Sequence, residues 1–103
     1  MAYIHQISFI IDRDQLGRLD VGSPLQKGLS FLRVQLPDFE GFITSRARYS
    51  IDEGNDVLVV VESVWDDYES LEEHRASGVT EEKLRDDFGD LRDFRVREFV
   101  EVD

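Results

Sequence analysis

The chain has 103 residues, a length typical of one domain spanning residues 1–103, and carries a formal net charge of -11. That charge repels phosphate backbones and anionic lipid surfaces, so we expect no nucleic-acid partner and no membrane partner. The absence of cysteine excludes disulfides and thiolate metal sites, and the absence of any long apolar stretch or signal-like start predicts a soluble, cytoplasmic, acidic protein.

Residues 2–11 predict a first strand whose two faces both carry apolar side chains. The polar residues 12–22, with two glycines, predict a loop. Ser23 and Pro24 then supply a capping hydroxyl and a proline at the first helical position. Leucines follow at helical spacing, at Leu25, Leu29, Leu32 and Leu36. They predict an amphipathic helix that ends at Pro37.

Residues 39–50 predict a second strand, and the Asp-Glu-Gly-Asn sequence at 52–55 predicts a tight turn. The turn leads into the longest apolar run, residues 57–61, which is almost entirely β-branched. The two strands should therefore form an antiparallel hairpin. A run that is apolar at both parities predicts a central strand covered on both faces.

After Trp65 the period changes from strand to helix. Asp66 and Glu69 form a pattern resembling a capping box, and Tyr68 and Leu71 lie on one helical stripe with His74 near its edge. Thr80 is the expected cap of a second short helix. Residues 94–102 are mixed and charged, which predicts an edge strand.

The resulting order is strand, helix, strand, strand, helix, strand, which predicts an α+β, ferredoxin-like split βαβ fold with a four-stranded antiparallel sheet. Helices would cover only one face of that sheet. Leu58, Val60 and Val64 lie at one parity of the central strand and Val57, Val59 and Val61 at the other, so the face without helices also carries apolar side chains. We therefore expect a second copy of the chain to cover this face, which makes the protein a homodimer.

Three segments carry a resemblance to a known family: PDFEGF from Pro37 to Phe42, the IDEGND turn, and WDDYESLEEHRAS, in which His74 follows Trp65 by nine residues. Together they resemble the antibiotic-biosynthesis-monooxygenase-like family. The resemblance implies a dimeric α/β barrel. It also implies a monooxygenase, an oxidoreductase that uses no metal and no other cofactor and binds a phenolic substrate in a cavity between sheet and helices.

Two departures from the family pattern bear on function. Active oxygenases of the family often carry an asparagine on the strand that ends in the tryptophan, whereas the only asparagine here is Asn55, in the turn. Haem-degrading relatives use a histidine on a later helix as the iron ligand, and no histidine follows His74. The sequence therefore predicts no haem and no metal.

Four residues are candidates for the site, each with a structural alternative. His74 is the candidate catalytic base, since an imidazole titrates near neutrality, or it bonds a carbonyl at the helix end. Trp65 stacks on an aromatic substrate or pins the helix to the sheet. Tyr68 donates to a substrate oxygen or packs, and Arg46 binds a phenolate or forms an internal ion pair. His5 is expected to be a satisfied, partly buried strand residue.

Two functions remain open on this reading. One is a cofactor-independent monooxygenase acting on a small phenolic or quinol-type compound. The other is a non-catalytic dimeric module that binds a small molecule or a partner protein. A hollow space with polar groups near Trp65 and His74 favours the enzyme, whereas a space filled by apolar side chains favours the module.

Overall fold

The computed structural model describes residues 1–16, 32, 34–51 and 54–102. The predicted helix beginning at Ser23 lies mostly outside the described residues; from its stripe, Leu32 and Leu36 are buried. The elements are β1 (Ala2–Asp12), α1 (Arg13–Leu16), the 3-10 turn η1 (Leu36–Asp38), β2 (Phe42–Tyr49), β3 (Asp56–Trp65), α3 (Tyr68–Ser77), α4 (Val79–Phe88) and β4 (Arg92–Glu101).

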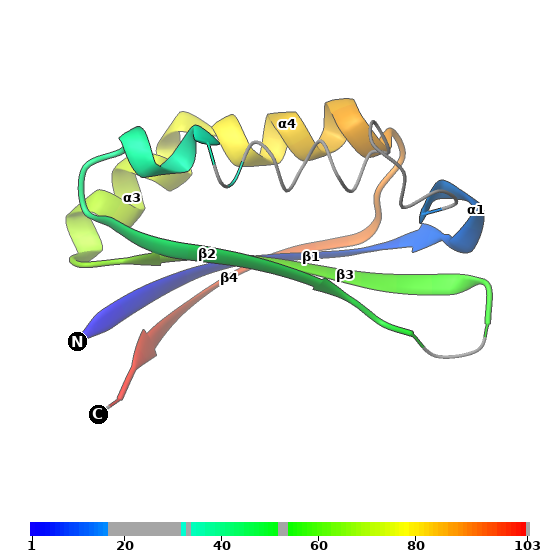
Figure 1. The fold of residues 1–103 in the computed structure, drawn as a ribbon, viewed down its shortest axis with the longest axis horizontal. Coiled ribbons are helices and arrows are strands. Elements are labelled where there is room, and N and C mark those ends of the chain that lie inside the picture. The colour runs from blue at the N-terminus through cyan, green and yellow to red at the C-terminus, as the bar shows by residue number, and fades with distance from the viewer. Residues whose placement is uncertain (17–31, 33, 52–53, 103) are drawn as a thin grey trace.

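The four strands form one antiparallel sheet in the order β2-β3-β1-β4. Helices α3 and α4 lie over one face of this sheet (Figure 1). The predicted α+β ferredoxin-like architecture is therefore confirmed, as are the hairpin between β2 and β3 and the edge position of β4. The apolar run of β3 lies in the interior of the sheet, where both of its edges are hydrogen-bonded to neighbours.

The core lies between the sheet and the helical layer. Antiparallel register pairs Ile7 with Val61 and Phe9 with Val59, so alternate residues of the two inner strands point toward the helices. From α4, Leu84 and Phe88 fill the space above them, and the rings of Phe9 and Phe88 lie 5.3 Å apart. Burial of these side chains, worth about 1.5–3 kcal/mol each, holds α4 on the sheet.

The opposite face, here called the open face, carries the other parity of each strand. No helix or strand of the described residues covers it. Leu58 and Phe99 are 45% and 43% exposed there. Near its centre Glu62 is buried, and Arg46 and Arg48 pair with its carboxylate at 3.4 Å and 2.8 Å. The centre of the open face therefore combines apolar side chains with the paired carboxylate of Glu62.

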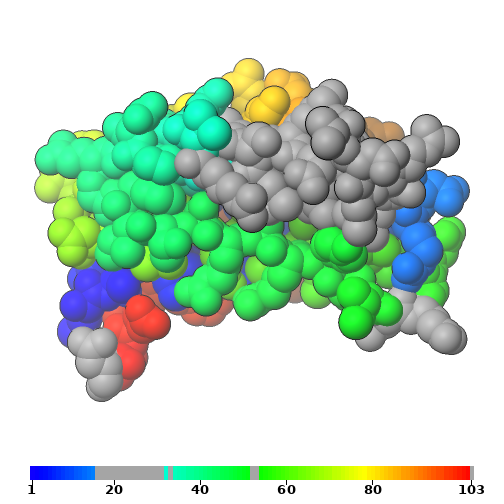
Figure 2. Space-filling view, in the orientation of Figure 1, coloured from blue at the N-terminus to red at the C-terminus, as the bar shows by residue number. Residues whose placement is uncertain are grey.

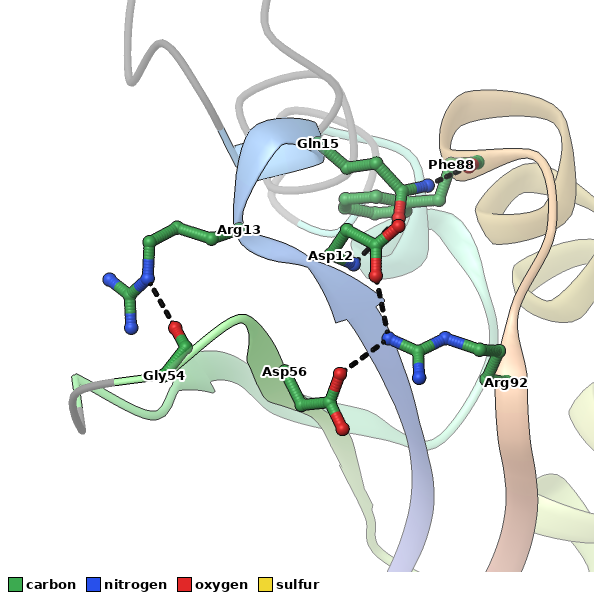
Figure 3. Close-up of polar contacts among 7 residues, drawn as sticks. All are labelled: Asp12, Arg13, Gln15, Gly54, Asp56, Phe88 and Arg92. Atoms are coloured by element: carbon green, nitrogen blue, oxygen red, sulfur yellow. Dashed lines mark hydrogen bonds and ion pairs between the residues drawn. The ribbon is translucent and has the colours of Figure 1, made fainter.

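The two ends of the sheet differ: the chain termini project from one end, and side-chain hydrogen bonds close the other. The start of β1 and the end of β4 project together at one end of the molecule (Figures 1 and 2). At the other end, Arg92 donates to Asp12 and to Asp56, at 2.9 Å each, and so links β4 to β1 and β3 (Figure 3). Gln15 of α1 donates to the carbonyl of Phe88 at 2.9 Å and joins this end to α4. These contacts close the end of the sheet that lies away from Trp65.

Three local predictions were wrong. Asp67, rather than Asp66, caps α3, because the Asp67 carboxylate accepts from the Ser70 N–H at 2.8 Å. Thr80 lies inside α4, whose N-cap is Gly78, and its hydroxyl contacts His74 instead of a backbone N–H. The segment predicted as a loop from residue 12 begins with the last residue of β1 and the short helix α1.

Gly41, in the turn before β2, anchors the end of β3. Its carbonyl accepts from the Asp66 N–H at 2.8 Å, at the point where β3 gives way to α3. Gly41 has φ +81°, and a Cβ built there lies 2.4 Å from Ser70 Oγ. A side chain at this position is therefore unfavourable both for its backbone conformation and for its contact with α3.

We expect Gly41→Ala to lower the free energy of unfolding by more than Gly78→Ala. Gly78 also has positive φ, at +66°, but a Cβ there has no neighbour within 4 Å among the described atoms. The Gly78 change should cost about 1–2 kcal/mol for conformation alone, and the Gly41 change a further 1–3 kcal/mol for the steric overlap. Urea unfolding of both variants measures the difference, and equal losses would contradict the close packing of Gly41 against α3.

Candidate functional site

The site is built on an aromatic stack at the end of β3. The Trp65 side chain is fully buried, and its ring lies on that of His74 with centroids 4.8 Å apart and planes 28° from parallel. The rings of Phe39 and Phe42 meet the indole edge-on at 6.3 Å and 5.6 Å. The indole N–H donates to Ser63 Oγ at 2.8 Å, so Trp65 has no polar group left for a ligand.

His74, on α3, is the ionisable residue of this stack and is almost fully buried. It is 2% exposed, and its Nε2 lies 3.0 Å from Thr80 Oγ1. Gly78, in the left-handed conformation, ends α3 and begins α4, which brings Thr80 back over the imidazole. The Nδ1 atom is buried and has no hydrogen-bond partner among the described residues. Leaving such a group unpaired costs about 1–3 kcal/mol.

A cavity of about 470 Å³ lies against this histidine, between β1 and β4 on the sheet and α3 and α4 above it. Its volume is within the range of small-molecule sites. The lining residues are His5, His74, Arg75, Gly78, Thr80, Glu81, Val96 and Glu98. Both histidines of the chain thus lie in the wall of one cavity.

His5 is the lining residue whose role sequence reasoning missed. It is 5% exposed, as expected for a buried strand histidine, but its ring meets that of His74 edge-on at 5.4 Å. Its register partner on β4 is Glu98, another lining residue. The signal in the sequence was the parity of His5, which it shares with Ile7 and Phe9 on the face that the helices cover.

Burial sets the charge state of both histidines. Burial, with a smaller contribution from His5, lowers the pKa of His74 from 6.5 to about 4. Burial also lowers the pKa of His5, and the neighbouring Glu98 carboxylate opposes that shift. Both imidazoles are therefore largely neutral at pH 7 and keep a lone pair on one ring nitrogen.

Ionised side chains form the wall beside the histidines. Arg75 Nη1 pairs with Glu98 at 2.6 Å, and Nη2 of the same guanidinium pairs with Glu72. The hydroxyl of Tyr68 donates to Glu98 at 3.2 Å. The carboxylates of Glu72 and Glu98 raise the pKa of Tyr68 to about 12, so Tyr68 stays a neutral phenol.

The four residues predicted from the sequence are only partly together. His74 lines the cavity, Trp65 lies directly behind its ring, and Tyr68 contacts the lining residue Glu98. Arg46 lies on the open face, where it pairs with Glu62. Arg46 could therefore contact a ligand only at a second site on the open face, because the cavity lies on the opposite face of the sheet.

The described part of the chain contains no group of three or more histidines and carboxylates arranged to hold a metal ion. Among the same residues, no helix is long and apolar enough to cross a membrane.

Comparison with known proteins identifies the fold. No protein-family model and no curated protein matches the sequence. A putative antibiotic biosynthesis monooxygenase from Deinococcus radiodurans superposes with a TM-score of 0.68 at 10% identity, over 100% of this chain and 94% of that one. The cofactor-independent oxygenase SnoaB from Streptomyces nogalater gives 0.55 at 13% identity, over 99% and 93%. The resemblance seen in the sequence is confirmed at the level of the fold.

The de novo designed protein Foldit4 also matches, with a TM-score of 0.66 at 14% identity, over 99% of this chain and 100% of that one. Because a designed chain shares the fold of this chain, the fold alone implies no activity. An argument about function must rest on the cavity and its residues.

We expect the stability of the protein to fall between pH 7 and pH 5 because His74 is held neutral. The unfolded chain binds a proton near pH 6.5 and the folded chain only near pH 4, so the free energy of unfolding decreases as pH falls through this window. The loss attributable to His74 should reach about 2 kcal/mol at pH 5. Urea unfolding measures it.

His74→Phe should remove the part of this pH dependence that His74 contributes and leave the part due to His5, whatever its effect on stability at pH 7. His5→Phe is the matched comparison, since burial is the larger cause of the lowered pKa of His74 and most of the His74 contribution therefore stays in place. An unchanged difference between pH 7 and pH 5 in the His74 variant would show that His74 is not held neutral by the fold.

Proposed function

We propose that this chain is a cofactor-independent monooxygenase that acts on a small phenolic or quinol-type compound in the cavity beside His74. The supporting observation is the Nδ1 atom of His74, a buried ring nitrogen without a partner among the described residues, on a side chain that lines the cavity. This nitrogen is buried in the unliganded protein, so a ligand hydroxyl would satisfy it once a movement of the surrounding side chains exposes it to the cavity. The overall fold, shared with SnoaB, is consistent with the proposal.

The proposed chemistry uses the neutral imidazole as a base. His74 removes a proton from the substrate, and Thr80 on Nε2 holds the ring in place. The resulting carbanion or phenolate gives electrons to molecular oxygen. One oxygen atom becomes a carbonyl oxygen on a ring carbon, and the other leaves as water with two hydrogens, one from the phenol O–H and one from that carbon.

The other lining residues would bind and orient the substrate. Val96 offers an apolar surface, and His5 presents a second imidazole beside that of His74. Trp65 acts through its stack on His74, which fixes the plane of the base. Tyr68 orients Glu98 through its hydrogen bond. Such positioning supplies much of the rate in a reaction that has no cofactor.

One observation favours the alternative function, a dimeric module that binds a small molecule without catalysis. The pKa of His74, about 4, lies well below the near-neutral value that suits a general base at pH 7. A neutral histidine pair of this kind still binds a hydroxyl group. The two functions differ in oxygen consumption, which only the enzyme shows.

Under the enzyme proposal, His74→Ala should lower oxygen uptake about 10²–10⁴-fold, the usual contribution of a positioned base. The assay measures uptake with a panel of phenols and quinols, corrected for uncatalysed oxidation, on variants whose circular dichroism matches the parent. Arg46→Gln, on the open face, is the comparison and should change uptake little. Binding without any uptake would support the module instead.

We also propose that a second copy covers the open face. Leu58 and Phe99 are exposed there on a sheet whose other face is already packed. Two subunits of net charge -11 repel each other, so association should tighten as salt rises from low to physiological concentration.

Sedimentation at micromolar concentration should therefore give a dimer. Leu58→Asp should shift it to monomer, because the new charge would be buried without a partner. Ile51→Asp, at a position 86% exposed beside the turn, should leave the dimer intact. A parent protein that sediments as a monomer, or a dimer that weakens as salt rises, would contradict this interface.

A further inference from the structure

The charges around the cavity point to a narrower class of ligand than the fold does. Two carboxylates, Glu81 and Glu98, line the cavity, against one guanidinium, Arg75. Arg75 is shared, since it pairs with Glu98 on one side and with Glu72 on the other. One positive charge therefore faces two acids in this contact alone.

The other basic groups near the cavity do not neutralise this excess of negative charge. Glu81 pairs with Arg85 at 3.3 Å, but both side chains are about half exposed, so the pair is well screened by solvent. The two histidines of the lining are buried and contribute hydrogen-bonding nitrogens rather than charge. The wall of the cavity thus presents excess negative charge, which opposes a second anion.

Glu98 is the main determinant in this arrangement. Its strand partner is His5, and its carboxylate accepts from Tyr68 while it pairs with Arg75. The carboxylate is therefore held in place beside the histidines. A ligand hydroxyl that reaches His74 would bring the rest of the ligand close to this charge.

Resting on the proposed function, we propose that the cavity selects by charge: it takes uncharged or positively charged hydroxyaromatic compounds and rejects those with an ionised carboxylate. Glu98 is the specificity-determining residue, with Glu81 adding to its effect. The reaction that supplies the substrate must then deliver a phenol or quinol without a free acid group.

The test uses three probes that share a phenol ring and differ in charge: para-cresol, tyramine and para-hydroxybenzoate. Calorimetry on the full chain measures their affinities at pH 7 and low salt. Proton signals of the two histidine rings locate the binding, since both rings line the cavity. We expect para-hydroxybenzoate to bind at least about tenfold more weakly than para-cresol, and tyramine at least as tightly as para-cresol.

Glu98→Gln should reduce the ratio between para-cresol and para-hydroxybenzoate to less than about threefold, since the amide keeps the shape and removes the charge. Glu101→Gln is the matched control, because Glu101 lies on the same strand, exposed and outside the cavity lining. It should leave the ratio unchanged. Glu81→Gln gives a second, smaller reduction and serves if the Glu98 variant does not fold.

The outcomes separate the two proposals. Equal binding of para-cresol and para-hydroxybenzoate at the histidines overturns the charge selection and leaves the proposed site intact. A ratio that neither Glu98→Gln nor Glu81→Gln changes also overturns it. If none of the three probes binds or moves the histidine signals, both the site and its selectivity are wrong.

Discussion

The stack of the Trp65 indole on the His74 imidazole is the contact on which this side of the molecule depends. It joins the end of the most buried strand to the helix that follows it, with the rings of Phe39 and Phe42 closing around the indole. The Gly41 carbonyl and the Asp67 cap fix the turn between them. Because the ring of His74 is held on one face by Trp65, its plane is fixed and its Nε2 atom meets Thr80.

Burial of the unpaired His74 nitrogen costs free energy, and the packing of the stack does not require a histidine at this position. An apolar side chain at position 74 would stack on Trp65 equally well and leave no buried nitrogen unpaired. His5, which meets His74 edge-on, is a second ionisable group held in the same interior. Groups retained at a cost to stability concentrate at functional sites, which is the physical reason for placing the site here.

Much of the fold could be predicted from the sequence because its signals are local. The β-branched run of β3, the turn chemistry around Gly54 and the change of period after Trp65 each depend on near neighbours. Contacts between side chains that are far apart in the sequence were harder to predict. The partner of Arg46 is Glu62, across the β2–β3 register on the open face, and a shift between Phe42 and Thr44 precedes that pairing. Nothing local in the sequence showed on which face Arg46 would lie.

The residues of the site divide in the same way: local spacing identified some of them, and only the folded structure brings the others together. His74 was identified from its spacing after Trp65, whereas its contact with Thr80 depends on the left-handed turn at Gly78, which returns the chain at an angle that the spacing does not encode. Thr80 looked like a helix cap for that reason. His5 and Glu98 become neighbours only through the pairing of the first strand with the last. Residues brought together by strands so far apart in the chain are found by topology rather than by motif.

The most direct test of this account is the nitrogen NMR spectrum of the two imidazole rings, recorded with and without a saturating uncharged phenol. The account predicts that His74 is neutral at pH 7 in the free protein. It also predicts that the Nδ1 resonance of His74 shifts on binding, while the Nε2 resonance, held by Thr80, changes little. A His74 ring that is protonated at pH 7, or one whose Nδ1 resonance is unmoved by every phenol tried, would contradict it.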